Sequence, residues 1–321
     1  MGLIWDGVKD ITGNVLHLRT KFVTNQRLDG QVVVITGANS GIGRETAIQL
    51  TLLGAKVIMG CRNRERADRA AEYLMANNMH AVVIVIQLDL SSLESVREFA
   101  DKVSQNESHI DILISNAGIA GIPERQTVDG IEMQFRTNYL GIHSRQLWPT
   151  YIDINHNFYA ITRVVSVSSF VYKVGKIHFD NINLRDGAYT HWKAYNQSKL
   201  ANVLFSRELA KRLGANSTIS TYSLHPGVIK TDIVRNYRPY VKGLYNMIGR
   251  LLFLTPRMGA QTSLYCALED GIENESGFYY QVCKKVEVSP IAMDDTAAER
   301  LWDLSVDLVN LDAHLNLPSS Y

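Results

Sequence analysis

The chain has 321 residues, of which 46% are hydrophobic and 20% charged, and this balance is typical of a folded globular protein rather than a disordered or fibrous one. Its 33 basic residues face 32 acidic ones, so no overall positive field favours nucleic-acid binding. The three cysteines, Cys61, Cys266 and Cys283, are scattered and odd in number, which argues against a disulfide framework and a metal site and favours a reducing compartment.

Residues 1–28 form an N-terminal arm with one apolar stripe. The stripe recurs at steps of four and three residues, as on one face of a helix, and consists of Ile4, Val8, Ile11, Val15, Leu18 and Phe22. It either packs on the main domain or docks as an amphipathic helix on a membrane surface or a partner protein. Because no apolar run of about 18 residues exists, we expect neither a transmembrane segment nor a signal peptide. The expected location is cytoplasmic or peripheral on an intracellular membrane.

From residue 29 to residue 321, short apolar runs alternate with helix-period stretches. The strand-like runs span residues 31–36, 55–60, 81–88, 110–115, 163–167 and 218–224. Such alternation implies right-handed crossovers between parallel strands, with helices on both faces of the sheet. No linker or repeat interrupts the pattern, so we predict a single α/β domain with a doubly wound, Rossmann-type parallel sheet.

A glycine-rich turn follows the first predicted strand, where residues 36–43 read TGANSGIG. Glycines there let the backbone turn sharply and approach a pyrophosphate, whose charge is attracted by the N-terminus of the following helix. An ordinary glycine turn is the alternative, but the place between a strand and a helix favours a dinucleotide site. We therefore expect cofactor contacts from Gly37, Asn39, Ser40, Gly41, Ile42 and Gly43.

The second predicted strand ends at Arg62 rather than at the carboxylate that would bind the ribose 2′-hydroxyl of NAD. The planar guanidinium of Arg62 suits a 2′-phosphate, and Arg44 adds a second cation, so the sequence favours NADP over NAD. The alternative is that both arginines are solvated surface charges. Asp89, followed by Leu90 at the end of the third strand, either binds the adenine amino group or caps the next helix.

Hydride transfer to a carbonyl needs a proton donor whose pKa lies within reach of neutral pH. Tyr195 and Lys199 share one helix face at a spacing of four, and a lysine cation lowers the pKa of a nearby phenol by stabilising the phenolate. The same spacing begins at Tyr172, Tyr189 and Tyr280, but only Tyr195 opens a long helical run. We therefore expect Tyr195 to exchange the proton.

Two serines follow the strand-like run at 163–167. Ser168 and Ser169 thus lie at the end of the sheet where such folds bind their ligands. A hydroxyl there can polarise a carbonyl, although serines at such positions more commonly cap turns.

Taken together, these motifs resemble the short-chain dehydrogenase/reductase family from about residue 29 to the C-terminus. Residues 115–118 read SNAG, which is similar to the NNAG motif of the family, and a Pro-Gly pair precedes a threonine as in its nicotinamide-binding segment. The resemblance implies cofactor contacts from Asn116, Ala117, Gly118, Tyr195, Lys199, Pro226, Gly227 and Thr231.

The resemblance also implies catalytic roles, position by position. Ser169 would polarise the carbonyl, Tyr195 would exchange the proton, and Lys199 would bind the ribose and modulate the pKa of the tyrosine. Asn138 would hold a water molecule, and a helix cap is the alternative role for this asparagine.

Longer phrases are similar to the retinol dehydrogenase branch of this family. They are SKLANVLFSRELAKRL at 198–213, HPGV at 225–228, and SGFYYQVCKKVEVSP at 276–290 followed by TAAERLW. The branch prefers NADP and acts on retinal, retinol and other lipophilic aldehydes. Such substrates suit the apolar segment at 232–256, which we expect to be a substrate lid, with core packing as the alternative. The alternative functions are the same chemistry on steroids or other lipid carbonyls, and a non-catalytic NADP-binding sensor.

Two features depart from that branch. Many of its members begin with a hydrophobic membrane anchor, whereas this chain has the amphipathic arm. The long apolar helix that the family has after Asn138 is here interrupted by Arg145 and by Pro149, which costs roughly 3 kcal/mol inside a helix. Since that helix supports the cofactor cleft and the dimer face in the family, a homodimer and full activity are both left open.

Overall fold

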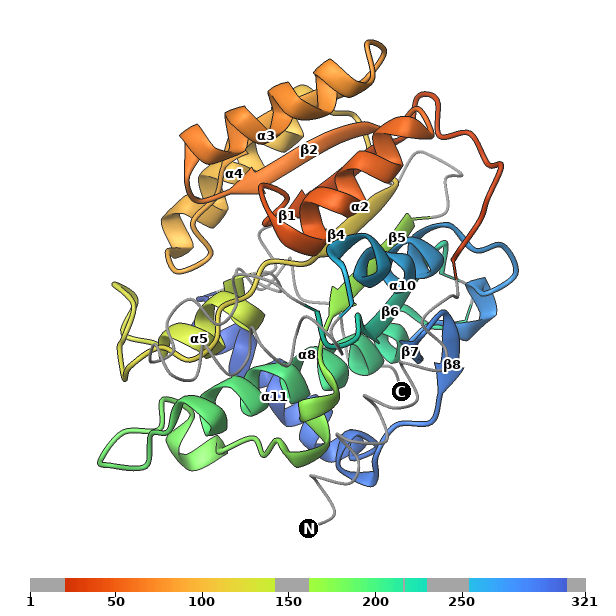
Figure 1. Ribbon diagram of the computed structural model, residues 1–321. Coiled ribbons are helices and arrows are strands. Elements are labelled where there is room, and N and C mark those ends of the chain that lie inside the picture. The colour runs from red at the N-terminus through yellow and green to blue at the C-terminus, as the bar shows by residue number, and fades with distance from the viewer. Residues whose placement is uncertain (1–20, 142–161, 216, 230–253, 311–321) are drawn as a thin grey trace.

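The computed structural model describes residues 21–141, 162–215, 217–229 and 254–310. A sheet of eight strands forms its centre, with the order β3-β2-β1-β4-β5-β6-β7-β8 (Figure 1). Neighbouring strands from β3 to β7 pair in parallel, and β8 pairs antiparallel with β7. The strands are β1 (Val32–Thr36), β2 (Lys56–Cys61), β3 (Val82–Gln87), β4 (Ile112–Ser115), β5 (Thr162–Val167), β6 (Ile219–His225), β7 (Tyr279–Gln281) and β8 (Lys284–Val286).

Helices cover both faces of the sheet. The long ones are α2 (Gly41–Leu52), α3 (Arg64–Asn77), α4 (Leu93–Asn106), α8 (His191–Leu213), α10 (Pro256–Leu268) and α11 (Asp295–Leu308). Alternate side chains of β1 enter two different cores: Val33 and Ile35 pack with α2, α3 and α10, whereas Val32 and Val34 pack in the core that α4, α8 and α11 share. The doubly wound parallel sheet expected from the sequence is therefore confirmed.

A short helix, α5 (Met133–Phe135), continues directly into a π-helix, η1 (Arg136–Leu140). The buried carboxylate of Glu132 begins this unit by accepting hydrogen bonds from the backbone N–H groups of Gln134 (2.9 Å) and Phe135 (2.6 Å). Burial raises the pKa of Glu132 to about 7. The 3-10 helices are η2 (Phe170–Val174), η3 (Phe179–Asn181), η5 (Glu273–Glu275) and η6 (Pro290–Ala292).

Helix α11 packs on α8 (Figure 1), and one hydrogen bond joins it to η1. The rings of Trp302 and Phe205 stack with their centres 5.3 Å apart, and the guanidinium of Arg212 lies 4.6 Å from the centre of the Trp302 ring. The hydroxyl groups of Tyr139 and Ser305 share a hydrogen bond of 2.8 Å. Aromatic packing thus joins α11 to α8, the helix that carries Tyr195, and the buried polar bond joins α11 to η1.

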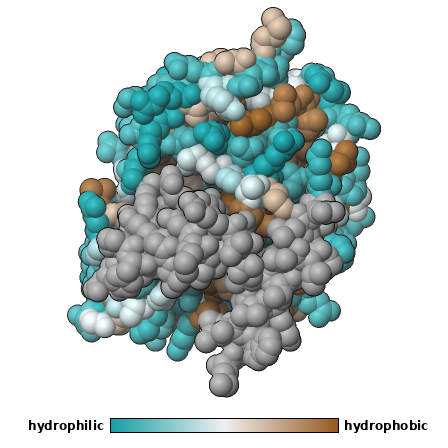
Figure 2. Space-filling view, in the orientation of Figure 1, coloured by the Kyte–Doolittle hydropathy of each residue, from teal (hydrophilic) through white to brown (hydrophobic). Residues whose placement is uncertain are grey.

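The end of the arm packs against α10. The Phe22 N–H donates to Gln261 Oε1 (2.9 Å), the rings of Phe22 and Tyr265 meet edge to face at 5.6 Å, and Leu28 is fully buried. The rest of the apolar stripe, from Ile4 to Leu18, and most of the expected lid lie outside the described residues. No helix in the described ranges is both long and apolar enough to cross a membrane. On the face that Figure 2 presents, the described residues are mostly hydrophilic, and hydrophobic ones occur in small groups.

Candidate active site

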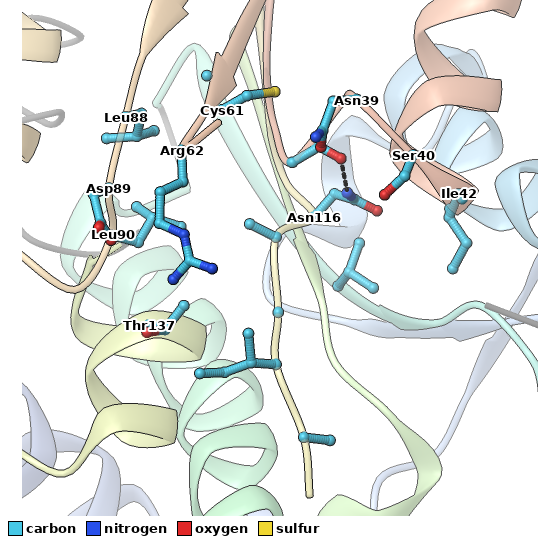
Figure 3. Close-up of a pocket in the computed structure, with 18 of the residues that line it drawn as sticks. Asn39, Ser40, Ile42, Cys61, Arg62, Leu88, Asp89, Leu90, Asn116 and Thr137 are labelled. Atoms are coloured by element: carbon cyan, nitrogen blue, oxygen red, sulfur yellow. Dashed lines mark hydrogen bonds between the residues drawn. The ribbon is translucent and has the colours of Figure 1, made fainter. Parts of the chain in front are cut away.

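An open cleft runs along the carboxyl ends of the central strands. One side of it carries the glycine turn after β1, and the opposite side carries the residues that follow β2 and β3, with Asn116 between them (Figure 3). Parallel α/β sheets bind their ligands at this edge. Of the residues expected to contact the cofactor, the cleft is lined by Gly37, Asn39, Ser40, Gly41, Ile42, Arg62, Asp89, Leu90, Asn116, Ala117, Gly118, Tyr195, Lys199 and Pro226.

The glycine turn requires glycine at Gly37 and Gly43 for different reasons. Gly37 has a positive φ of 68°, which residues with a Cβ rarely adopt. A Cβ on Gly43 would lie 2.6 Å from the carbonyl oxygen of Gly37 and 2.4 Å from Nδ2 of Asn116. Gly43 is buried behind the turn and does not line the cleft, so its contribution is the close approach of α2 to the turn.

The N-terminus of α2 faces the cleft with its backbone. Ser40 is the residue before the helix, and its side chain makes no capping hydrogen bond to the first turn. Thr190, by contrast, caps α8 by accepting from Lys193 N–H at 3.2 Å. The uncapped first turn of α2 is the arrangement that suits a phosphate.

The adenosine end of the cleft contains two arginines. Arg62 follows β2 as expected, and Arg66 in the first turn of α3 also lines the cleft, one helical turn further on. Sequence reasoning missed Arg66 and chose Arg44 as the second cation. Arg44 instead lies over the ring of Tyr73, 5.7 Å from its centre, and is not among the lining residues.

Asp89 lines the cleft and does not cap α4. Its carboxylate accepts hydrogen bonds from the Ser91 N–H (2.9 Å) and the Ser91 hydroxyl (2.6 Å). The cap of α4 is Ser92, which accepts from the Ser95 N–H at 3.2 Å. The capping alternative for Asp89 was therefore wrong.

Helix α8 places Tyr195 and Lys199 one turn apart at the floor of the cleft. The ammonium of Lys199 lies 5.7 Å from the centre of the Tyr195 ring and donates to the carbonyl of Val167 at 2.9 Å. Burial lowers the pKa of Lys199 to about 8. A cation thus lies beside the phenol ring of Tyr195.

The other tyrosines with the same spacing have structural roles. The Tyr172 hydroxyl accepts from the Ser289 N–H (3.1 Å), the Tyr189 hydroxyl donates to the carbonyl of Ile122 (2.8 Å), and the Tyr280 hydroxyl bonds to Glu275. None of the three lines the cleft. The helical context that favoured Tyr195 therefore selected the tyrosine that lines this cleft.

The two serines after β5 differ in their contacts. Ser168 lines the cleft, but its hydroxyl donates to the backbone carbonyl of Lys199 at 2.7 Å. Ser169 precedes η2, is 9% exposed, and makes no capping hydrogen bond with its side chain. The hydroxyl of Ser168 therefore fixes α8 against β5. Ser169 is the remaining candidate for polarising a carbonyl, although it is not among the residues that line the cleft.

Asn138 lies inside the π-helix η1, so the helix-cap alternative was wrong. Its amide exchanges two hydrogen bonds with the backbone of Ile119, accepting at 2.8 Å and donating at 2.9 Å, and it donates to the Ser198 hydroxyl at 3.0 Å. The side chain is fully buried and joins the segment after β4 to α8. Single π-turns of this kind occur frequently at functional sites.

On the nicotinamide side, Pro226 lines the cleft and Gly227 has a φ of 91°. A Cβ on Gly227 would lie 2.5 Å from the side chain of Leu254, whose N–H donates to the Val228 carbonyl at 2.9 Å. Thr231 lies outside the described residues.

Comparison with known proteins identifies the family of this chain. A family model described as short chain dehydrogenase matches residues 31–242, and the chain belongs to the short-chain dehydrogenase family. It is similar to Retinol dehydrogenase 14 of Homo sapiens at 44% identity, over 97% of this chain and 95% of that protein. It is also similar to Retinol dehydrogenase 12 of Homo sapiens at 42% identity, over 90% of this chain and 89% of that protein.

Two solved structures show the same fold. An uncharacterized protein from Mycobacterium Paratuberculosis has a TM-score of 0.72 at 34% identity, over 91% of this chain and 97% of that one. A short chain dehydrogenase from Shigella flexneri complexed with NADP has a TM-score of 0.61 at 20% identity, over 81% of this chain and 100% of that one. Family, relatives and fold together make this protein a retinol dehydrogenase-like oxidoreductase with a nicotinamide cofactor.

Proposed function

We propose that the protein is an NADP-dependent oxidoreductase that interconverts a small lipophilic aldehyde or ketone and its alcohol, with retinal and retinol as the foremost pair. The observation that carries the proposal is the placement of Tyr195 and Lys199 at the floor of a cleft that begins at a phosphate-binding type of glycine turn. The retinoid part rests on the two human relatives, both of which are named retinol dehydrogenases.

Tyr195 is the proposed acid in carbonyl reduction. When bound, a reduced nicotinamide would supply the hydride for the carbonyl carbon, and the Tyr195 hydroxyl would give its proton to the carbonyl oxygen. The ammonium of Lys199, held by the carbonyl of Val167, stabilises the phenolate that remains. Ser169 is the proposed donor that polarises the carbonyl before the transfer.

Asn138 has a positioning role in this proposal. Its side chain is already bonded to Ile119 and Ser198, so a water molecule would have to be held by the backbone of the π-helix rather than by the amide. The amide itself keeps the cleft wall after β4 at a fixed distance from α8.

The preference for NADP rests on Arg62 and Arg66. Both line the adenosine end of the cleft, and two guanidinium groups can bind the 2′-phosphate through charge-assisted hydrogen bonds. The strand that precedes them ends at Cys61, whose thiol is buried and has its pKa raised to about 11, so this position adds no negative charge.

NADPH oxidation by the purified protein tests the function. All-trans-retinal, a medium-chain aldehyde and a steroid ketone are the substrates, and NADH is the parallel cofactor. Turnover of retinal with NADPH supports the proposal. Faster turnover of the steroid ketone than of retinal would instead favour another lipid carbonyl as the substrate. NADPH binding without turnover of any substrate favours a cofactor sensor.

Tyr195→Phe tests the catalytic assignment. We expect turnover to fall about a hundredfold or more while NADPH binding is retained. Tyr280→Phe is the matched control, because Tyr280 begins the same spacing to a lysine but lies outside the cleft. Equal turnover in the Tyr195 variant and the wild type would remove the tyrosine from the mechanism.

A peripheral membrane contact through the arm, a homodimer, and a cytoplasmic location stay predictions from the sequence.

A further inference from the structure

A buried arginine in the π-helix has no role in the chemistry described above. The side chain of Arg136 is fully buried, and its Nε lies 3.3 Å from Oδ2 of Asp129. Its two η nitrogens have no hydrogen-bond partner among the described residues. Burial lowers the pKa of Arg136, and the charge of Asp129 opposes this effect. A guanidinium held by a single ion pair is costly inside a protein.

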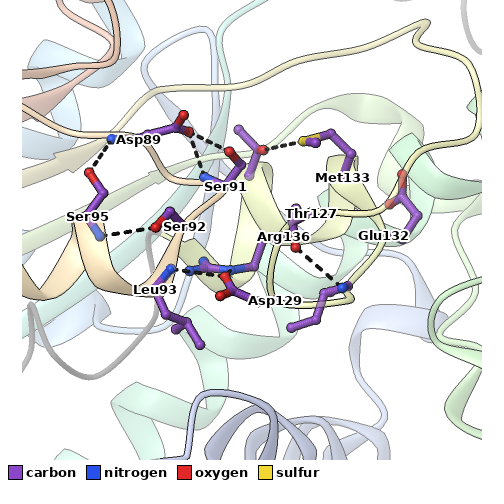
Figure 4. Close-up of polar contacts among 12 residues, drawn as sticks. Asp89, Ser91, Ser92, Leu93, Ser95, Thr127, Asp129, Glu132, Met133 and Arg136 are labelled. Atoms are coloured by element: carbon purple, nitrogen blue, oxygen red, sulfur yellow. Dashed lines mark hydrogen bonds and ion pairs between the residues drawn. The ribbon is translucent and has the colours of Figure 1, made fainter.

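The partner of Arg136 also holds the start of α4. The carboxylate oxygen of Asp129 that faces Arg136 accepts the N–H of Leu93, the first residue of α4, at 3.0 Å (Figure 4). One oxygen atom thus connects the π-helix to the N-terminus of α4, where a negative charge is favourable.

Arg136 also borders the cleft segment before α4. A Cβ on Gly141 would lie 2.9 Å from Nη1 of Arg136 and 2.4 Å from the carbonyl oxygen of Leu90, so these two atoms face the same small volume. The charge of Asp89 also acts on the guanidinium. Asp89 and Leu90 are residues of the adenosine wall of the cleft.

The residues that follow Arg136 reach the other parts of the site. Thr137 lines the cleft below Arg62 (Figure 3), and Asn138 bonds to Ile119 and Ser198. Within three consecutive residues the π-helix therefore connects the adenosine wall, the cleft floor and the helix that carries Tyr195.

We propose that the Arg136–Asp129 pair is a positioning unit, which fixes the adenosine wall at Asp89 and Leu90 relative to Thr137 and Asn138 and thereby preorganises the cofactor cleft. The proposal rests on the proposed nicotinamide function of this cleft. Buried ion pairs contribute little to stability compared with neutral residues of similar volume, so a gain in stability does not account for this one. Preorganisation of the binding site accounts for the pair, because a rigid cleft loses less entropy when the cofactor binds.

Three variants separate positioning from stability: Arg136→Met, Asp129→Asn, and the double variant that carries both. Asp129→Asn leaves the fully buried guanidinium without its partner, and Arg136→Met leaves the partly buried carboxylate without its partner, so both should lower the melting temperature. The double change removes both charges, and we expect its melting temperature to return to that of the wild type. NADPH affinity should stay about tenfold weaker than in the wild type, since the wall has lost its link to the π-helix.

NADPH and adenosine 2′,5′-bisphosphate are the probes, and binding is measured without substrate. Loss of affinity for both, in a double variant of wild-type melting temperature, supports the proposal. Return of both affinities to wild-type values together with the melting temperature overturns it and makes the pair merely structural. The double change Arg163→Met with Glu273→Gln is the control, because it removes an ion pair between a buried arginine and a partly exposed glutamate that lies outside the cleft.

Failure of the proposed retinoid activity can be distinguished from failure of the positioning proposal. In that case the wild type oxidises no NADPH with any carbonyl, while the effect of the double variant on NADPH affinity is still measured. Where the wild type is active, the double variant should also show a lower kcat at saturating NADPH, because Asn138 is displaced along with Arg136.

Discussion

Replacing Lys199 with methionine is expected to stabilise the protein while abolishing its turnover. The ammonium is almost fully buried, and its pKa falls from 10.5 to about 8 because burial disfavours the charged form. This difference corresponds to about 3 kcal/mol, by which the charged lysine destabilises the folded protein near neutral pH. Loss of the hydrogen bond from Nζ to Val167 costs about 1 kcal/mol, so the net gain in the free energy of unfolding is about 2 kcal/mol.

The pH dependence of this gain follows from the two pKa values. Between about pH 8 and pH 10.5 the unfolded chain binds more protons at Lys199 than the folded protein does, so the stability of the wild type rises with pH in this window. The methionine variant lacks the group, and its advantage should therefore be largest below about pH 8 and shrink as the pH approaches 10.5.

Urea unfolding at several pH values across this window, together with NADPH turnover, measures both effects. Lys193→Met is the matched control: it changes an exposed lysine of the same helix and should alter neither stability nor its pH dependence. A Lys199→Met variant that is less stable than the wild type near neutral pH, or whose stability difference does not change with pH, would refute the reasoning.

Three further changes test the cleft and the core. Arg62→Ala combined with Arg66→Ala should weaken NADPH binding by about tenfold or more and leave NADH binding unchanged, as measured by fluorescence titration. An equal loss of affinity for both cofactors would contradict the 2′-phosphate role of the two arginines. Gly43→Ala should destabilise the protein by about 1–3 kcal/mol and weaken NADPH binding, since its Cβ meets the backbone of the glycine turn; unchanged binding would show that the turn adapts. Trp302→Ala should cost about 3–5 kcal/mol in urea unfolding because it removes the ring stacked on Phe205, and a loss below 1 kcal/mol would show that α11 contributes little.

Much of the fold and half of the site depend on local patterns, which made them predictable. The glycine turn follows a buried strand, and the spacing between Tyr195 and Lys199 corresponds to one helical turn. Both features are recognisable without knowledge of distant contacts, and the structure has them where the sequence placed them.

The remainder depends on tertiary contacts. Arg66 lines the cleft from the first turn of α3, whereas Arg44 lies over the Tyr73 ring and is not among the lining residues. The sequence of the π-helix has no periodicity that distinguishes it from an ordinary helix. Neither the burial of Arg136 nor the hydrogen bonds of the Asn138 amide to Ile119 and Ser198 could therefore be expected. Strand β8 has three residues, which is too short for a strand pattern to be recognised in the sequence.

The packing of α11 on α8 and η1 affects the order in which the protein can be completed during translation. Tyr139 and its partner Ser305 are 166 residues apart, and ribosomes add about 5–20 residues per second. Tyr139 therefore lacks this partner for roughly 8 to 33 seconds while the chain emerges. Phe205 lies 97 residues before Trp302, the residue that stacks on it, and lacks that ring for roughly 5 to 20 seconds. During that interval the nascent protein exposes aromatic surface of the kind that chaperones bind, and η1 and α8 gain their full packing only after α11 has been made.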